Sequence, residues 1–290
     1  MTQPDRSLDR SISDLLPAVR KLAERAGQAI LEIYEDPAAF GTEAKDDGSP
    51  LTRADLASHR LLLQGLTALT PDVPVLSEES AEIDAQQRSR WTRYWLVDPL
   101  DGTKEFVKRN GEFTVNVALI EVRRGVGVPV AGVVHVPVTG TTYAGAEGFG
   151  AWRQQGEDRQ PIATATLGDE PIQVVASRSH GNPATDAFIA GLEERFGDVR
   201  TASSGSSLKL CRVAEGAAHY YPRVAPTMEW DTAAADAVVR AAGGVVWRYG
   251  TRQPLAYAKA DLHNPPFLVA FHASAPLPDA YASTLPEENA

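Results

Sequence analysis

The chain contains very little cysteine: among its 290 residues, only Cys211 carries a thiol. A single cysteine excludes an internal disulfide, and such cysteine usage is typical of a reducing compartment. No apolar run approaches the roughly 20 residues that a membrane-spanning helix needs. Residues 1–10 are polar and lack an apolar core, which predicts no secretory signal. We therefore expect a cytoplasmic protein without a transmembrane segment, and a peripheral association with the inner membrane stays an open alternative.

Basic residues are also few. Lysine and arginine number 28 against 38 aspartates and glutamates, so the formal net charge is -10. Non-specific binding to DNA or RNA depends on a basic face, and we therefore expect no nucleic-acid partner. A small nucleotide is not excluded, because a few local cations are enough to hold a phosphate. Hydrophobic residues make up 43% of the chain, which suffices for the core of one large domain or two smaller ones.

Hydrophobic periodicity predicts the elements of an N-terminal half. Apolar residues at helical spacing predict a helix from Ser13 to Tyr34 and a second helix that follows Thr52. Thr52 and Asp55 have the spacing of a capping box, in which two side chains bond backbone amides at a helix start. Alternating apolar residues then predict an antiparallel sheet with strands over 113–122, 130–136 and 141–146.

A polar connection at 154–171 leads to a second half, in which strands and helices alternate as in an α/β layer. The last long helix is expected over 232–242, with Asp231 as its N-cap. We therefore expect four segments: a disordered tail at 1–11, an N-terminal α+β half at 12–160, a C-terminal α/β half at 161–273 and a loose tail at 274–290.

One predicted strand ends in a group of oxygen ligands. The apolar run Tyr94–Val97 leads into Asp98-Pro99-Leu100-Asp101-Gly102-Thr103. Proline lacks an amide hydrogen and favours extended geometry in the residue before it, so Asp98 is expected to end the strand. Thr103 is expected to begin a short helix whose free amides face an anion. Two carboxylates and the Leu100 carbonyl suit Mg²⁺, although a simple Asp-rich helix cap would explain the same residues.

Three further acids, Asp55, Glu78 and Asp231, also fall at the ends of expected elements. Each has a simple alternative explanation, since aspartates cap helices and glutamates are common in exposed loops. One site explains all five acids together, because carboxylates brought close repel one another unless cations bind among them. Two Mg²⁺ ions about 3.5–4 Å apart would do this and would clamp the attacking and leaving oxygens of a phosphoryl transfer.

Three sequence blocks resemble the signature motifs of the inositol monophosphatase superfamily, a group of Mg²⁺-dependent, lithium-sensitive phosphatases. In the order of that family, the blocks are Val75-Leu76-Ser77-Glu78-Glu79, Trp95–Thr103 and Trp230-Asp231-Thr232-Ala233-Ala234. The resemblance covers nearly the whole chain. It implies an α/β fold, a layered αβαβα sandwich of the inositol monophosphatase or sugar phosphatase type, with a metal site in the first half and substrate contacts in the second.

Within the superfamily, the chain is most similar to the bacterial CysQ-type 3'(2'),5'-bisphosphate nucleotidases. The similarity rests on residues 101–114, on Ser177-Arg178-Ser179-His180 and on Gly205-Ser206-Ser207-Leu208-Lys209. Inositol monophosphatases usually carry Thr-Asn in place of Lys104-Glu105. They also tend to place an acid, which meets inositol hydroxyls, where this chain has Pro222-Arg223. An arginine suits an anionic substrate better than a polyol.

The resemblance implies two or three bound Mg²⁺ ions. Their implied ligands are Glu78, Asp98, the carbonyl of Leu100, Asp101 and Asp231. Asp98 would bridge two ions. Thr103, oriented by Asp55, would position the attacking water and pass its proton on.

The resemblance also implies a small-molecule nucleotide bisphosphate substrate. Its implied contacts are Gly102, Thr103 and Lys104 at the scissile phosphate, and Ser177, His180, Gly205 and Lys209 at the nucleotide and its second phosphate. The implied reaction converts adenosine 3',5'-bisphosphate (PAP) to AMP and phosphate in sulfur assimilation recycling, with the sulfated precursor PAPS, converted to APS, as a second candidate substrate. Two alternatives stay open: an inositol-1-monophosphatase or broad sugar phosphatase of the same fold, and a non-catalytic nucleotide-sensing module.

Overall fold

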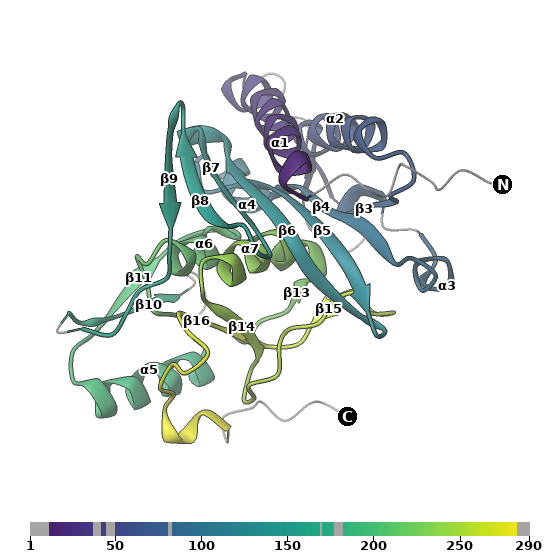
Figure 1. Ribbon diagram of the computed structural model, residues 1–290. Helices are drawn as coiled ribbons and strands as arrows, with labels where there is room; N and C mark the ends of the chain where they lie inside the picture. Colours follow the sequence, from purple (N-terminus) through teal and green to yellow (C-terminus); the bar gives the residue numbers. More distant parts are fainter. Residues whose placement is uncertain are drawn as a thin grey trace.

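The structure of the chain, a computed structural model, describes residues 12–36, 42–44, 50–80, 83–168, 170–176 and 182–282. These residues form two main sheets and three layers of helices that alternate with them (Figure 1). The predicted disordered tail at 1–11 lies outside the described residues. Among the described residues, no helix combines the length and the apolar composition that a bilayer crossing requires.

The larger sheet has seven strands in sequence order. They are β3 (Val75–Ser77), β4 (Arg93–Asp101), β5 (Thr114–Arg123), β6 (Val126–Val136), β7 (Thr141–Ala146), β8 (Gly150–Gln155) and β9 (Asp158–Ile162). The pair β3 and β4 is parallel, and every later strand pairs antiparallel with the one before it. Strand β9 lies within the stretch that was predicted as a polar connection. Its side chains are almost all exposed, and such an edge strand has no apolar alternation to reveal it.

The smaller main sheet has the strand order β11-β10-β12-β16-β14. Its strands are β10 (Ile172–Ala176), β11 (Val199–Ser203), β12 (Tyr220–Arg223), β14 (Val245–Arg248) and β16 (Phe267–Ala270). Two short antiparallel pairs complete the strands: β1 (Thr42–Ala44) with β2 (Pro50–Thr52), and β13 (Thr227–Met228) with β15 (His263–Asn264).

The helices form the remaining layers. On the outer face of the larger sheet lie α1 (Ile12–Glu35) and α2 (Arg53–Leu69), whereas α6 (Leu208–Ala214) and α7 (Glu229–Ala241) lie between the two sheets (Figure 1). Helix α5 (Pro183–Phe196) packs on the smaller sheet, and α3 (Ala85–Arg88) and α4 (Thr103–Val107) are short connecting helices. This αβαβα order confirms the predicted α/β fold class.

Helix α7 lies unusually close to the larger sheet. A Cβ atom at Gly132 of β6 would lie 2.1 Å from the carbonyl oxygen of Ala234, so only glycine permits this approach. The helix is itself rich in alanine, which keeps its surface narrow. This close backbone approach therefore fixes the distance between α7 and the larger sheet.

The predicted loose tail at 274–290 is wrong for its first nine residues. Ala275 is buried, and Tyr281 is only 6% exposed, with ring centroids 4.9 Å from Tyr249 and 6.0 Å from Phe188. This aromatic contact, together with hydrogen bonds from Tyr220 and Arg252 to the backbone, holds a segment whose prolines and acids suggested a solvated tail. Residues 283–290 lie outside the described part of the chain.

Candidate active site

Most of the predicted site residues line one cleft of about 350 Å³. It is lined from the end of β4, the starts of α4, α6 and α7, and the end of β12. The predicted residues on its wall are Glu78, Asp98, Leu100, Asp101, Gly102, Thr103, Lys104, Lys209 and Asp231. Asp55 reaches this group through Thr103. Ser177 and His180 lie outside the described residues.

The end of β4 is shaped by a β-bulge. Asp98 pairs with Asn116 and Asp101 with Thr114, so β4 has one more residue than β5 over this interval. The prediction that Asp98 ends the strand is therefore wrong, because the bulge accommodates Pro99 without a ladder hydrogen bond. The peptide group after Pro99 is held at both ends: Ser58 Oγ donates to its carbonyl oxygen at 2.7 Å, and the Leu100 amide donates to Asp98 Oδ1 at 3.0 Å.

Three carboxylates converge at this bulge. Asp98, Asp101 and Asp231 each offer an oxygen, and these oxygens lie within 4.8 Å of one another. Burial and the nearby charge of Glu78 raise the pKa of Asp98 well above its ordinary value. Burial and the charge of Asp101 raise the pKa of Asp231 to about 8. Ionised together, these groups repel strongly, so the cluster has the electrostatics of a cation site.

The position of Asp231 corrects one prediction. Helix α7 begins at Glu229, so Asp231 is its third residue and not its N-cap. Its Oδ2 accepts a hydrogen bond from the Met228 amide at 2.8 Å. The carboxylate therefore satisfies the helix start from within the first turn and still lines the cleft.

Asp55 combines two contacts through its two carboxylate oxygens. Oδ2 accepts hydrogen bonds from the amide and hydroxyl of Thr52, at 2.8 and 2.5 Å, which confirms the predicted capping box. Oδ1 lies 3.4 Å from Thr103 Oγ1, which also lies 3.4 Å from the Leu100 carbonyl oxygen. The helix cap thus orients a buried carboxylate toward the hydroxyl of Thr103.

A buried lysine, Lys209, also lines the cleft. Lys209 is 7% exposed, and its ammonium donates to the carbonyl oxygens of Ser204 and Ser206 at 3.3 and 2.7 Å. Burial lowers the pKa of Lys209 to about 8, against the opposing effect of Asp101. The Arg223 side chain also lines the cleft, so two cationic groups face the anionic cluster.

Gly205 does not line the cleft but allows its wall to form. A Cβ atom there would lie 2.8 Å from the carbonyl oxygen of Glu112, closer than real Cβ contacts come. Only glycine therefore lets the segment before α6 pass so close to the loop between α4 and β5.

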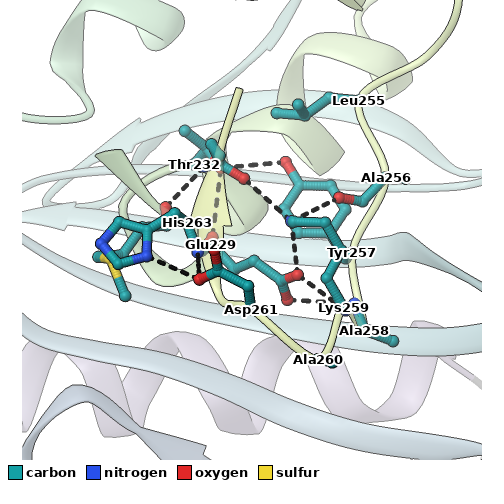
Figure 2. A network of polar contacts seen from close by, with 12 residues as sticks. Glu229, Thr232, Leu255, Ala256, Tyr257, Ala258, Lys259, Ala260, Asp261 and His263 are labelled. Atoms are coloured by element: carbon teal, nitrogen blue, oxygen red, sulfur yellow. Dashed lines mark hydrogen bonds and ion pairs between the residues drawn. The ribbon is translucent and has the colours of Figure 1, made fainter. Parts of the chain in front are cut away.

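The sequence did not indicate the role of Glu229, the first residue of α7. This fully buried carboxylate accepts hydrogen bonds from the amides of Ala258 and Lys259 at 3.1 and 3.0 Å and from the Lys259 ammonium at 2.6 Å (Figure 2). It holds the loop after β14 against the helix turn that carries Asp231. Its partners are about 30 residues away along the chain, so no local spacing pattern could have revealed them.

Comparisons with known proteins agree with this architecture. Residues 11–276 match the Inositol monophosphatase family. The 3'(2'),5'-bisphosphate nucleotidase CysQ of Escherichia coli K12 is 46% identical over 259 residues, which is 89% of this chain and 100% of that protein. The enzyme of the same name from Salmonella typhimurium is 49% identical over 80% of this chain and 89% of its own length.

A solved structure agrees as well. The crystal structure of CysQ from Bacteroides thetaiotaomicron, described as a bacterial member of the inositol monophosphatase family, superposes with a TM-score of 0.79 at 43% identity. The superposition covers 90% of this chain and 98% of that one. The chain therefore belongs to the inositol monophosphatase family.

Proposed function

We propose that the chain is a 3'(2'),5'-bisphosphate nucleotidase that uses Mg²⁺ to hydrolyse the 3'-phosphate of PAP, giving AMP and phosphate. The observation that carries this proposal is the shared cleft, in which three convergent carboxylates face Lys209 and Arg223. The Escherichia coli and Salmonella relatives, at 46–49% identity, are named as 3'(2'),5'-bisphosphate nucleotidases, which supports the same reaction.

The donor set fits Mg²⁺. Every predicted ligand is a carboxylate or carbonyl oxygen, and the described residues on the cleft wall include neither cysteine nor histidine. In the proposal, Glu78, Asp98 and the Leu100 carbonyl would hold one ion, and Asp98, Asp101 and Asp231 would hold a second. When bound, such ions stabilise charge on phosphoryl oxygens and acidify water. Burial and the neighbouring carboxylates raise the pKa values of Asp98 and Asp231, and a bound cation would lower both.

Thr103 and Asp55 supply the proton path. The Thr103 hydroxyl accepts a proton from the attacking water as its own proton passes to Asp55 Oδ1, 3.4 Å away. Water oxygen bonds to phosphorus on one side as the bond from phosphorus to the 3'-oxygen breaks on the other, and the 3'-oxygen takes a proton from solvent water to become the hydroxyl of AMP. Asp55 is suited to this role because its second oxygen is already fixed by the helix cap.

Substrate preference follows from the cations on the cleft wall. Lys209 and Arg223 would contact the phosphate that does not react, and this remote contact favours a bisphosphate over a monophosphate or a polyol. Lys104, at the start of α4, lies on the same wall and would contact the scissile phosphate. The nucleotide contacts of Ser177 and His180, the use of PAPS, the place in sulfur assimilation and the cytoplasmic location stay predictions.

The test is phosphate release from PAP and from inositol 1-phosphate, each measured with Mg²⁺ and with a chelator. We expect Mg²⁺-dependent release with a strong preference for PAP, and almost none from an Asp98→Asn variant that keeps its fold. Equal or reversed rates on the two substrates would move the protein to the inositol or sugar phosphatases. Binding of PAP without turnover in the presence of Mg²⁺ would support the sensing module instead.

A further inference from the structure

A buried polar cluster lies directly behind Asp101. Its members are Thr114 and Asn116 on β5 and Ser207 at the start of α6, all at most 2% exposed. Ser207 Oγ donates to Asn116 Oδ1 at 2.9 Å and lies 2.9 Å from Thr114 Oγ1. No local sequence pattern indicates this cluster, because Ser207 is about 90 residues from its partners.

All three residues donate to the same oxygen of Asp101. Oδ2 accepts from the Ser207 amide at 2.5 Å, from Asn116 Nδ2 at 3.3 Å and from Thr114 Oγ1 at 3.4 Å. Burial raises the pKa of Asp101, and the charge of Lys209 and these donors oppose that rise. Because all three bonds converge on Oδ2, they fix the plane of the carboxylate and leave Oδ1 for the cation site.

One peptide group connects this oxygen to Lys209. The peptide between Ser206 and Ser207 donates its amide hydrogen to Asp101 Oδ2 and accepts the Lys209 ammonium on its carbonyl oxygen, at 2.7 Å. Ser206 has a φ of 43°, in the left-handed region that residues other than glycine rarely adopt. The turn is therefore held in an unfavourable conformation that presents the two ends of one peptide to two charged groups.

We propose that Thr114, Asn116 and Ser207 are positioning residues that couple the two halves of the site. They orient Asp101 toward the metal, and through the Ser206–Ser207 peptide they set the position of Lys209 for the second phosphate. Loss of one member loosens both the carboxylate and the lysine. The role that this inference gives to Lys209 rests on the proposed function. The effect of the cluster on metal binding does not depend on the substrate.

The test compares two matched hydroxyl deletions. Thr114→Val removes a hydroxyl from the cluster, and Thr142→Val removes an equally buried hydroxyl whose partner is His135 Nδ1, on the side of the sheet that α1 covers. Asn116→Leu is the stronger variant, and Thr114→Ser is the conservative one. Calorimetric titration of the substrate-free protein with Mg²⁺ gives the metal Kd, and initial rates at saturating Mg²⁺ give KM for PAP.

We expect Asn116→Leu to weaken Mg²⁺ binding about tenfold or more and Thr114→Val about threefold, since residues behind metal ligands commonly affect affinity on this scale. KM for PAP should rise in the same variants, and Thr114→Ser and Thr142→Val should keep both constants. An unchanged Mg²⁺ Kd in folded Thr114→Val and Asn116→Leu would overturn the proposal, as would an equal loss in Thr142→Val. Failure of the wild-type protein to hydrolyse PAP would refute the proposed function, while the calorimetric comparison would still decide the role of the cluster.

Discussion

Replacing Asp231 by asparagine should stabilise the protein in the absence of Mg²⁺ while weakening the second of the two proposed metal sites. The pKa of Asp231 rises from 3.8 to about 8, because burial and the charge of Asp101 both disfavour the ionised form. Asparagine keeps an oxygen for the Met228 amide but carries no charge. The variant therefore removes electrostatic repulsion without removing the hydrogen bond that starts α7.

The expected stabilisation by Asp231→Asn follows from the pKa shift of Asp231. A tenfold change in proton affinity equals about 1.4 kcal/mol, so at pH 7 the raised pKa costs the folded state at most about 4 kcal/mol. Because Asp231 is partly exposed to the cleft, we take about half of this value, roughly 2 kcal/mol. For a chain of this size, such a gain corresponds to an increase in Tm of about 3–8 °C.

The size of the stabilisation by Asp231→Asn depends on pH. A carboxyl whose pKa is raised in the folded state destabilises the protein increasingly as the pH rises from about 4 to about 8. The advantage of Asp231→Asn should therefore be largest at pH 8 and should shrink toward pH 5. Thermal unfolding in chelator, followed by circular dichroism at both pH values, measures it, with Asp158→Asn on the exposed edge strand β9 as the control.

Addition of Mg²⁺ should reverse the ranking, because the wild-type protein also binds the ion that Asp231 would help to hold and therefore gains more stability than the variant. A Tm of Asp231→Asn equal to or below that of the wild-type protein, in chelator at pH 8, would refute the reasoning. So would a Tm increase by Mg²⁺ that is the same in both proteins.

Three other predictions concern the proton path, the loop behind α7 and metal binding. Thr103→Val should lower kcat for PAP by about 10²–10³-fold with a small change in KM, and Thr103→Ser should restore most of the rate in the same phosphate-release assay. Glu229→Gln leaves the Lys259 ammonium without its charged partner and should cost about 3 kcal/mol in urea unfolding, whereas Glu147→Gln in an exposed pair should cost less than about 1 kcal/mol. Mg²⁺ binding should tighten from pH 6 to pH 8 and should release protons. Calorimetry in buffers of different ionisation enthalpy will detect this proton release. An affinity independent of pH would contradict the raised pKa of Asp231.

Strongly patterned segments were predictable from the sequence. Strand β7 has the predicted bounds, and the Thr52–Asp55 capping box forms as expected, because each depends on residues close together in the chain. The family motifs also predicted the group of acids that meets at the end of β4. Strand β9 was missed, since an exposed edge strand carries no apolar alternation.

The buried residues that position the site residues were not predictable from the sequence. Asn116 and Ser207 meet across 91 residues, and Glu229 meets Lys259 across 30. A serine, an asparagine or a buried glutamate has no local signature that distinguishes it from a surface residue. The position of Asp231 within α7 also depended on this packing, because the helix starts at the buried Glu229, three residues earlier than the capping pattern suggested.

The central claim is that water attacks the 3'-phosphorus of PAP with Mg²⁺ bound at the carboxylate cluster. The most direct measurement is the reaction of PAP and Mg²⁺ in ¹⁸O-labelled water, with mass spectrometry of both products. We predict one labelled oxygen in the released phosphate and unlabelled 5'-AMP, with no reaction in chelator or by Asp98→Asn. Formation of 3'-AMP, labelled nucleotide, or equal turnover in chelator would contradict the account.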